Sequence, residues 1–191
     1  MNKKQRWSLQ EVVLLAFIAF IFGAVLMGGG YIYAPLKALL VVYGYKPFAN
    51  ELLFGIWTMA APVAAMIIKR PGAGVLGEVL AALAEMLYGS YFGAGVLISG
   101  FIQGLGSELG FTMTKYQRYD GLPLWLGAIG TTICSFSYEY FKYGYSDYSL
   151  PMIGALIAVR FISVVVFNVF LVQAIMNIYQ EIEAAIEVHH D

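Results

Sequence analysis

The segment GEVLAALAEMLYGSYFGAG, residues 77–95, carries two carboxylates in an otherwise apolar run. Glu78 and Glu85 are seven residues apart, which is two helical turns, so in a helix both side chains point to the same face. A charged side chain in a bilayer costs at least about 2.5–3.5 kcal/mol, so such residues usually face the interior of a helix bundle and serve a functional site. There, a carboxylate can neutralise and hydrogen-bond a cationic ligand.

Distances along the helices bring Glu85 close to an amide and an aromatic ring. A span that runs outward from about residue 73 places Glu85 roughly 12 Å below the outer membrane face, and a span that runs inward from about residue 93 places Gln103 roughly 15 Å below it. The connection between these spans is short, so we expect an antiparallel hairpin. Tyr88 follows Glu85 by three residues and shares its face. We predict that these three side chains form the floor of a pocket.

More carboxylates and aromatic rings are expected on the outer side of the same bundle. They suit a small, flat, cationic ligand, because carboxylates neutralise its charge and each ring face adds a cation–π attraction of about 0.5–2 kcal/mol. Two alternatives stay open: Glu85 as a protonated or hydrogen-bonded structural residue, and Glu139 as a solvated loop acid. The predicted substrate-binding residues are Glu85, Tyr88, Gln103, Trp57, Glu51, Tyr138 and Glu139.

Deeper polar residues predict either an ion pair or a contact with a partner chain. Glu78 and Glu108 are expected about 7–8 Å above the inner membrane face, and Arg160 roughly at the midplane. Because an isolated buried charge is costly, the simplest expectation is that Arg160 pairs with Glu108. The alternative is that Arg160 lies at an interface with a partner chain.

Small residues follow one stripe of the first apolar segment, at Ala16, Ala19 and Gly23. Ala19 and Gly23 form a small-xxx-small pair, which allows another helix to approach closely. That helix can belong to a partner chain or to the same bundle, and the sequence leaves both open. We predict a partner interface formed by Ala16, Ala19, Gly23 and Arg160.

The composition indicates that membrane-spanning helices position these residues. The chain has 191 residues, of which 60% are hydrophobic and 12% are charged, and its mean hydropathy is +0.74. Soluble domains carry roughly twice this charged fraction. Because a spanning helix needs roughly 20 apolar residues, we predict an all-α integral membrane protein, a six-transmembrane-helix bundle in a single membrane domain, 1–191. The predicted spans are 9–30, 49–68, 73–89, 93–113, 122–140 and 150–176, with a short interfacial helix at about 35–44 in the first outer loop.

The placement of lysine and arginine predicts the orientation of the bundle. With six spans and the N-terminus inside, the inner segments hold more of these residues than the outer segments, so both termini are expected to be cytoplasmic. The outer segments are rich in aromatic residues, which indicates either an interfacial belt or a lid over a ligand. The inner set is Lys3, Lys4, Arg6, Lys69, Arg70, Lys115 and Arg118, and the outer set is Lys37, Lys46 and Lys142.

Motifs of several enzyme and cofactor classes are absent from the sequence. It has no Gly-x4-Gly-Lys-Ser/Thr phosphate loop, no His-Glu-x-x-His and no Gly-x-Ser-x-Gly. The run GLGSELG, 104–110, lies inside an apolar span, so its glycines are expected to allow close helix packing. The single cysteine, Cys134, excludes an internal disulfide, and the histidines, His189 and His190, lie at the C-terminus outside every predicted span.

These absences lead us to expect no cofactor, no metal and no catalytic residue. A metal would require histidine and carboxylate ligands, and no histidine lies in a predicted span. The net charge of −1 gives no indication of a nucleic-acid partner. An integral membrane enzyme remains the alternative from another functional class.

Two segments carry a resemblance to a known family: GEVLAALAEMLYGSYFGAGVLISGFIQGLGSELGF, 77–111, and NELLFGIWTMAAPVAAMIIKRPGAG, 50–74. They resemble the substrate-binding S components of energy-coupling factor (ECF) vitamin transporters, a type of ABC transporter. In particular, they resemble the YkoE-type S components, which are associated with thiamine and its hydroxymethylpyrimidine precursor. The resemblance extends over nearly the whole chain.

This resemblance implies a substrate-capture subunit in the cell membrane of a prokaryote. Such a subunit would bind its vitamin from outside, with Glu85 taking the amino or cationic part of the ligand. It would then associate with a transmembrane T component and two cytoplasmic ATPases, and its first outer loop, 31–48, would act as a gate. Another vitamin, such as riboflavin or biotin, is the alternative ligand. Many S components carry Ala-x3-Ala in the first helix, whereas here Phe20 follows Ala16 by four residues.

Overall fold

The computed structural model describes residues 7–188, and this part of the chain contains helices and no strand. The all-α prediction is therefore confirmed. Lys3, Lys4, Arg6, His189 and His190 lie outside the described residues. The elements are α1 (Leu9–Val42), α2 (Phe48–Leu53), η2 (Phe54–Thr58), α3 (Ala60–Ile68), α4 (Ala73–Tyr88), η3 (Gly93–Gly95), α5 (Val96–Met113), α6 (Gly121–Lys142), η4 (Tyr145–Asp147), α7 (Leu150–Val164), the π-helical η5 (Val165–Leu171) and α8 (Val172–Val188).

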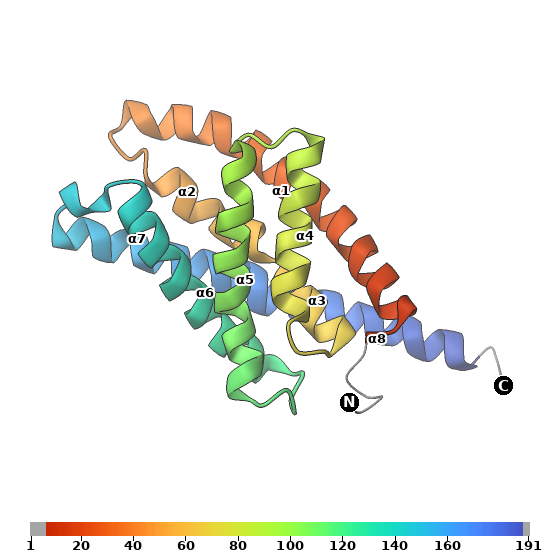
Figure 1. Cartoon of the computed structure of the whole chain (residues 1–191). Coiled ribbons are helices and arrows are strands. Elements are labelled where there is room, and N and C mark those ends of the chain that lie inside the picture. Colours follow the sequence, from red (N-terminus) through yellow and green to blue (C-terminus); the bar gives the residue numbers. More distant parts are fainter. Residues whose placement is uncertain (1–6, 189–191) are drawn as a thin grey trace.

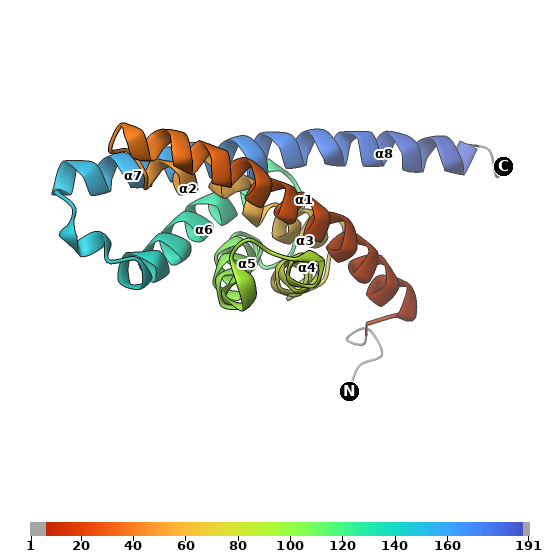
Figure 2. The same ribbon diagram turned by 90° about the horizontal axis from the view of Figure 1, so that it is seen from above.

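The helices pack around α3, whose side chains are almost all buried. In Figure 1, α4 and α5 stand side by side as an antiparallel hairpin, which confirms the predicted pairing of the third and fourth spans. α5 also packs on α6, and α4 also packs on α1 and α3. Figure 2, seen from above, shows the long α7–α8 run on the side away from the α4–α5 hairpin, with α1 running obliquely from that side toward α4.

The first helix is longer than predicted. It begins at a capping box, in which the Ser8 side chain accepts from the Glu11 backbone and the Glu11 side chain accepts from the Ser8 backbone. From there α1 continues for 34 residues to Val42, with Pro35 inside it. The expected short interfacial helix at 35–44 is therefore wrong. Proline removes one backbone hydrogen bond, and helices in membranes tolerate this loss where neighbouring groups satisfy the freed carbonyl.

The second predicted span is present but irregular, because a 3-10 segment, η2, interrupts it between α2 and α3. Backbone groups in a membrane interior must find hydrogen-bond partners inside the protein. Side chains from α7 and η5 supply them: the Ser163 hydroxyl accepts from the Gly55 N–H at 3.0 Å and donates to the Leu52 carbonyl at 2.8 Å. The Asn168 amide donates to the Thr58 carbonyl at 3.2 Å. The α7–η5 run therefore stabilises the break in the second span.

Three helical runs among the described residues are long and apolar enough to cross a membrane, as judged by length and composition: Leu9–Val42, Phe48–Ile68 and Leu150–Ile186. The last run is longer than the predicted span 150–176, and its C-terminal end extends beyond the other helices in Figures 1 and 2. α4 has only 16 residues, about 24 Å at 1.5 Å per residue. The six-span topology and the cytoplasmic position of both termini stay predictions.

Glycines of α5 allow its close contact with two neighbouring helices, as predicted for the run GLGSELG. A Cβ atom added to Gly106 would lie 2.6 Å from the Cα atom of Thr131 on α6. A Cβ atom added to Gly104 would lie 2.9 Å from the Cα atom of Val75 on α4. Both distances are shorter than real Cβ contacts, so any larger residue would push the helices apart.

Candidate ligand-binding site

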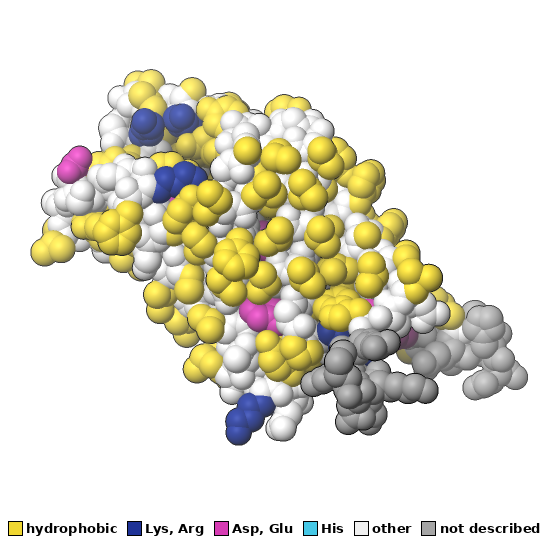
Figure 3. Space-filling model, viewed as in Figure 1, with side chains coloured by type: hydrophobic (Ala, Val, Ile, Leu, Met, Phe, Trp, Pro, Cys, Tyr) yellow, Lys and Arg dark blue, Asp and Glu magenta, His cyan; other side chains and the backbone are white. Residues whose placement is uncertain are grey.

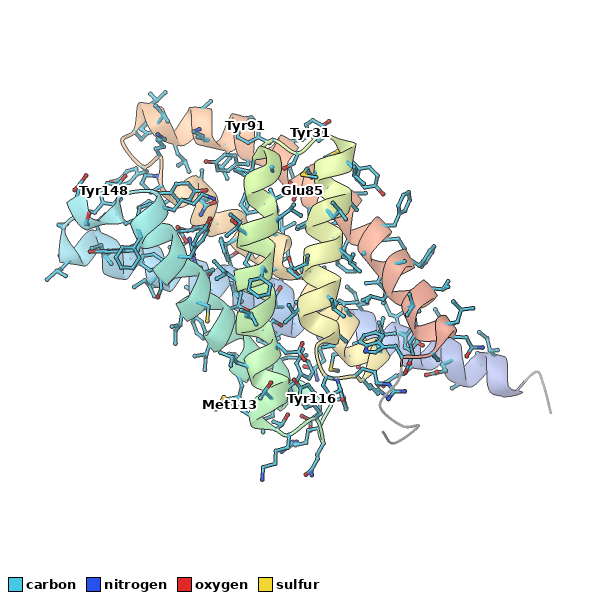
Figure 4. The ribbon with its side chains drawn as sticks, viewed as in Figure 1. Tyr31, Glu85, Tyr91, Met113, Tyr116 and Tyr148 are labelled. Carbon is cyan, nitrogen blue, oxygen red and sulfur yellow. The ribbon has the colours of Figure 1, made fainter. Side chains whose placement is uncertain are left out.

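A cavity of about 290 Å³ lies between the second span and helices α4, α5 and α6. Ligand pockets usually have volumes of roughly 300–1,000 Å³, so this inner cavity, as we call it, suits a small ligand. Figure 4 shows Glu85 near the upper end of α4, beside α5. The inner cavity is lined by Leu26, Asn50, Phe54, Trp57, Glu78, Ala82, Glu85, Phe92, Gly95, Val96, Ser99, Gln103, Glu139, Lys142 and Tyr143.

Three buried polar side chains of the α4–α5 hairpin converge on the inner cavity. Glu85 and Gln103 are only 3% and 7% exposed, and they lie together as the distances along the helices predict. Within the described residues, Gln103 makes no hydrogen bond, and Glu85 accepts one, from the Ser90 hydroxyl at 2.6 Å. Glu78 accepts one, from the Ala61 N–H at 2.7 Å. The remaining hydrogen-bonding capacity of these groups is directed at a mostly apolar cavity, which is typical of a ligand pocket.

Glu78 lines the cavity, although it is not among the substrate-binding residues predicted from the sequence. The estimate of depth along a straight helix separated it from Glu85 by two turns and placed it near the inner face. Both residues nevertheless line the same cavity, because the cavity extends along the helix rather than across it. The seven-residue spacing, which puts both acids on one face, was the signal that could have identified Glu78.

Trp57 forms an aromatic wall of the inner cavity. Its indole N–H donates to the Leu26 carbonyl at 3.1 Å, and its ring meets the Phe92 ring edge to face at 5.2 Å. Gly29 lies directly against it, since a Cβ atom added there would be 2.7 Å from the indole nitrogen. The position of the indole therefore depends on a hydrogen bond and a glycine of α1.

A buried ion cluster lies next to the inner cavity and corrects the predicted role of Arg160. The guanidinium donates to Glu51 at 2.5 and 2.8 Å, to the Ser135 hydroxyl at 3.1 Å and also to Glu139. The expected pair with Glu108 is therefore wrong. Arg160 is fully buried, so its side chain is not available to a partner chain, which contradicts that interpretation as well.

The two acids of this cluster differ in their relation to the inner cavity. Glu139 lines the cavity and also accepts from the Asn50 amide at 2.9 Å. Glu51 is fully buried and does not line it. Glu51 also accepts from the Tyr145 hydroxyl at 3.2 Å. Burial, and then the nearby carboxylates, raise the pKa of Tyr145 above its ordinary value, so this hydroxyl keeps the proton that it donates.

Glu108, the predicted partner of Arg160, bonds to backbone groups at the start of α4. Its carboxylate accepts from the backbone N–H groups of Gly72 at 2.6 Å, Gly74 at 2.9 Å and Val75 at 3.3 Å, and from the Tyr116 hydroxyl at 2.9 Å. The first N–H groups of a helix have no partner within the helix, and the helix dipole favours a negative charge there. Glu108 therefore caps the start of α4.

Two other predicted site residues lie outside the inner cavity. The Tyr88 hydroxyl donates to the Phe20 carbonyl of α1 at 3.1 Å, and its ring contacts the Phe20 ring. The Tyr138 ring lies against the ammonium group of Lys142, which is 5.0 Å from the ring centroid. Neither tyrosine lines the inner cavity.

The small-residue stripe of α1 is divided between the bundle and the surface. Ala19 and Gly23 are buried, and a Cβ atom added to Gly23 would lie 3.0 Å from the backbone nitrogen of Glu85 on α4. Their small size thus serves packing within this chain, the second of the two interpretations left open. Ala16 is exposed on the outside of α1.

A second cavity, of about 310 Å³, adjoins the inner cavity. We call it the tyrosine chamber. It shares the residues Asn50, Phe92 and Tyr143 with the inner cavity, and Figure 4 shows Tyr91 and Tyr148 at the same upper end of the molecule. The tyrosine chamber is lined by Tyr33, Lys37, Lys46, Pro47, Asn50, Tyr91, Phe92, Tyr143, Tyr145 and Tyr148.

Three comparisons with known proteins agree with this arrangement. A family model described as the permease component of an ABC-type cobalt transport system matches residues 10–134. The protein YkoE of Bacillus subtilis (strain 168), whose name gives it provisionally as an HMP/thiamine permease, is 32% identical over 157 residues, which cover 82% of this chain and 76% of YkoE. A crystal structure described as an S-component of an ECF transporter matches with a TM-score of 0.83 and 27% identity, covering 97% of this chain and 99% of the other.

Proposed function

This chain belongs to the S components of ECF transporters, and from that membership we propose that it captures thiamine or its hydroxymethylpyrimidine precursor from outside the cell. The S components are membrane proteins that bind the substrate of a transporter. The ligand is suggested by the name of YkoE and by the chemistry of the inner cavity.

The single observation that carries the proposal is the group of Glu78, Glu85 and Gln103 in a small, mostly apolar cavity. The aminopyrimidine ring of both ligands is flat and presents an amino donor and ring-nitrogen acceptors. In this proposal, the carboxylate of Glu85 accepts from the amino group, and the Gln103 amide donates to a ring nitrogen. The rings of Trp57 and Phe92 provide apolar surfaces for the ligand.

The acidic groups also fit the fixed positive charge of thiamine. Glu78 and Glu85 have no basic partner among the described residues, whereas Glu139 shares Arg160 with Glu51. The inner cavity therefore offers a negative charge that a thiazolium ring neutralises. Hydroxymethylpyrimidine would use the same amino and ring-nitrogen contacts without this additional attraction.

The remaining parts of the proposal concern assembly and location. The chain would lie in the cell membrane with six spans and both termini in the cytoplasm. A transmembrane T component and two cytoplasmic ATPases would complete the transporter and hydrolyse ATP. The loop between α1 and α2, together with the end of α1, would control access to the cavity from outside.

The test is ligand binding by the purified protein in detergent, followed by the fluorescence of Trp57 and the other tryptophans. Thiamine, hydroxymethylpyrimidine, riboflavin, biotin and Co²⁺ are titrated separately. We expect the two pyrimidine ligands to bind, and Glu85→Gln to weaken thiamine binding by about tenfold or more, the effect of losing one hydrogen bond to a charged group of about 1.5–3 kcal/mol. Glu181→Gln, the same change at an exposed position of α8, is the matched control and should bind normally.

Each outcome separates the alternatives. Preferential binding of riboflavin, biotin or Co²⁺ would show that the ligand is not a pyrimidine and would leave the proposed transport role unchanged. Unchanged affinity in Glu85→Gln would remove Glu85 from the site. If none of the compounds binds, the capture function itself is wrong for this chain.

A further inference from the structure

Glu85 occupies a position in α4 that helix stability does not explain. It lies in the last turn of the helix, which ends at Tyr88, and the partial negative charge at the C-terminal end of a helix disfavours a carboxylate there. Its side chain is only 3% exposed, and no salt bridge among the described residues includes it. A buried acid without a basic partner, in an unfavourable place, indicates a functional constraint.

A turn after α4 brings a hydroxyl group back to this carboxylate. In a continuous helix, side chains three or four residues apart are neighbours, and those five apart are not. Gly89, however, has a φ of 108°, a left-handed conformation that glycine adopts readily, and the helix ends there. Ser90 then donates its hydroxyl to Oε1 of Glu85 at 2.6 Å. Figure 4 shows Glu85 and Tyr91 at the same upper end of the molecule.

The backbone of the same connection holds the hydroxyl of Ser90. Its oxygen accepts from the Phe92 N–H at 3.2 Å, a local contact of the kind that serine often makes in turns. A serine hydroxyl has a single proton, and here that proton is donated to Glu85. The carboxylate is therefore oriented by a group whose own orientation is fixed.

The second oxygen of the Glu85 carboxylate is left for a ligand. Among the described residues, Oε2 accepts no hydrogen bond. The enclosed side-chain atoms without a partner in this part of the chain are Thr131 Oγ1 and Asn168 Oδ1. Oε2 is not one of them, so it retains contact with the open space of the inner cavity. Figure 3 shows mainly hydrophobic side chains over α4 and α5 on the visible face, so the polar pair lies beneath an apolar surface.

We propose that Ser90 is a positioning residue for the ligand: it holds the Glu85 carboxylate so that Oε2 accepts from the amino group of the pyrimidine ring. This inference rests on the proposed function, since it requires the ring to occupy the inner cavity. It identifies the residue that makes the site selective for an amino donor. A fixed acceptor penalises a ligand that presents another acceptor at the same point, because both groups then stay unpaired.

The test compares thiamine with oxythiamine, in which an oxo group replaces the amino group of the pyrimidine ring, in the same fluorescence titration. The parent protein should prefer thiamine. For Ser90→Ala, we expect the affinity for thiamine to fall by about fivefold, the size of one net hydrogen bond. The affinity for oxythiamine should stay within about twofold, because this compound makes no hydrogen bond to the positioned oxygen. A general loss of structure would instead weaken both ligands equally.

Two further variants test whether the hydroxyl is the active group and whether it acts through Glu85. Ser90→Thr keeps the hydroxyl and should restore the thiamine affinity of the parent protein. In a Glu85→Ala background, Ser90→Ala should change the thiamine affinity by no more than about twofold, because the group that it positions is absent. Ser137→Ala is the matched control, the same change at an exposed position of α6 that lines neither cavity, and should bind both ligands normally.

Four results would overturn the inference: equal affinity of the parent protein for the two ligands, equal weakening of both by Ser90→Ala, no rescue by Ser90→Thr, or an undiminished effect of Ser90→Ala in the Glu85→Ala background. Thiamine binding that is unchanged in Ser90→Ala would also remove this inference and leave the proposed function intact. If the parent protein binds neither compound, the proposed function is wrong and this inference is wrong with it.

Discussion

Arg160 and its two carboxylates form a cluster that the sequence could not pair correctly. Glu51 and Glu139 are separated from Arg160 by 109 and 21 residues. A depth estimate treats each helix as a straight rod normal to the membrane; it places Arg160 roughly at the midplane and leaves Glu108 as the simplest partner. The helices cross at an angle (Figure 1), so depth does not follow residue number equally in each of them. The cluster contains one arginine and two glutamates, so its formal net charge is −1.

Arg160→Leu is expected to destabilise the protein strongly. The substitution leaves Glu51 and Glu139 buried without their cation, and removing one partner of a buried ion pair typically costs about 3–5 kcal/mol. Unfolding in mixed micelles of increasing SDS content measures the loss. Arg118→Leu removes an arginine from an exposed pair with Asp120 and should change the transition little. Equal transitions for the two variants would show that the buried cluster is not a stabilising feature.

The individual residues of the site were predictable to the extent that hydropathy reports burial. A glutamate or glutamine in an apolar helix must face the protein interior, and this rule identified Glu85, Gln103 and Glu139. It does not say what a long side chain contacts. The Tyr88 hydroxyl reaches a carbonyl 68 residues away in the sequence, and no pattern of residue types specifies that contact.

At the scale of elements, helix locations followed from the apolar runs, but helix interruptions did not. Pro35 suggested an end, and α1 continues through it. The run from Ala49 to Ile68 suggested a regular helix, and η2 interrupts it. In both cases the deciding factor is whether a neighbouring element satisfies the backbone. For η2, that element is the α7–η5 run, through Ser163 and Asn168, which lies about a hundred residues further along the chain.

The contact between α1 and η2 makes Gly29→Ala an informative variant. The new methyl group would approach the indole nitrogen of Trp57 to 2.7 Å and force the ring to move. We expect the affinity for thiamine to fall by about tenfold, because a displaced indole loses its contact with the ligand ring, and an aromatic pair contributes about 0.5–1.5 kcal/mol. The fluorescence titration measures this effect.

Gly28→Ala is the control for this variant, since a Cβ atom at Gly28 meets nothing within 4 Å. It should bind thiamine normally and, because alanine favours helices more than glycine does, it should unfold no more easily than the parent protein. If Gly29→Ala also binds normally, the position of the indole does not matter for the ligand.

At the scale of the whole molecule, helix length and polar residues together explain why some spans are easier to identify than others. The three runs that qualify on length and composition include α1 and the α7–α8 run, which have large exposed apolar faces. The α4–α5 hairpin instead carries Glu78, Glu85 and Gln103 on the faces that line the cavity. α4 is also short, with 16 residues, so both its length and the polar residues of the hairpin make these spans less evident in the sequence.

The predicted orientation can be tested by labelling introduced cysteines. In a Cys134→Ser background, Ser146→Cys places a thiol in the connection between α6 and α7, and Gln117→Cys places one between α5 and α6; both positions are exposed. With both termini in the cytoplasm, a membrane-impermeant maleimide added to intact cells should label position 146 and not position 117. Permeabilised cells, in which both should react, provide the control. The reverse pattern would invert the topology.

The continuous α7–η5–α8 run has a consequence for the surroundings of the protein. Its 37 apolar-rich residues span about 55 Å at 1.5 Å per residue, against a hydrocarbon thickness of roughly 30 Å. Such a rod must incline or emerge from one leaflet, and its inclination depends on acyl-chain length through hydrophobic mismatch. Because this rod holds η2 through Ser163 and Asn168, membrane thickness is mechanically connected to the wall that carries Trp57. If the proposed capture function holds, we therefore expect the acyl-chain length of the lipid to change the affinity for the ligand.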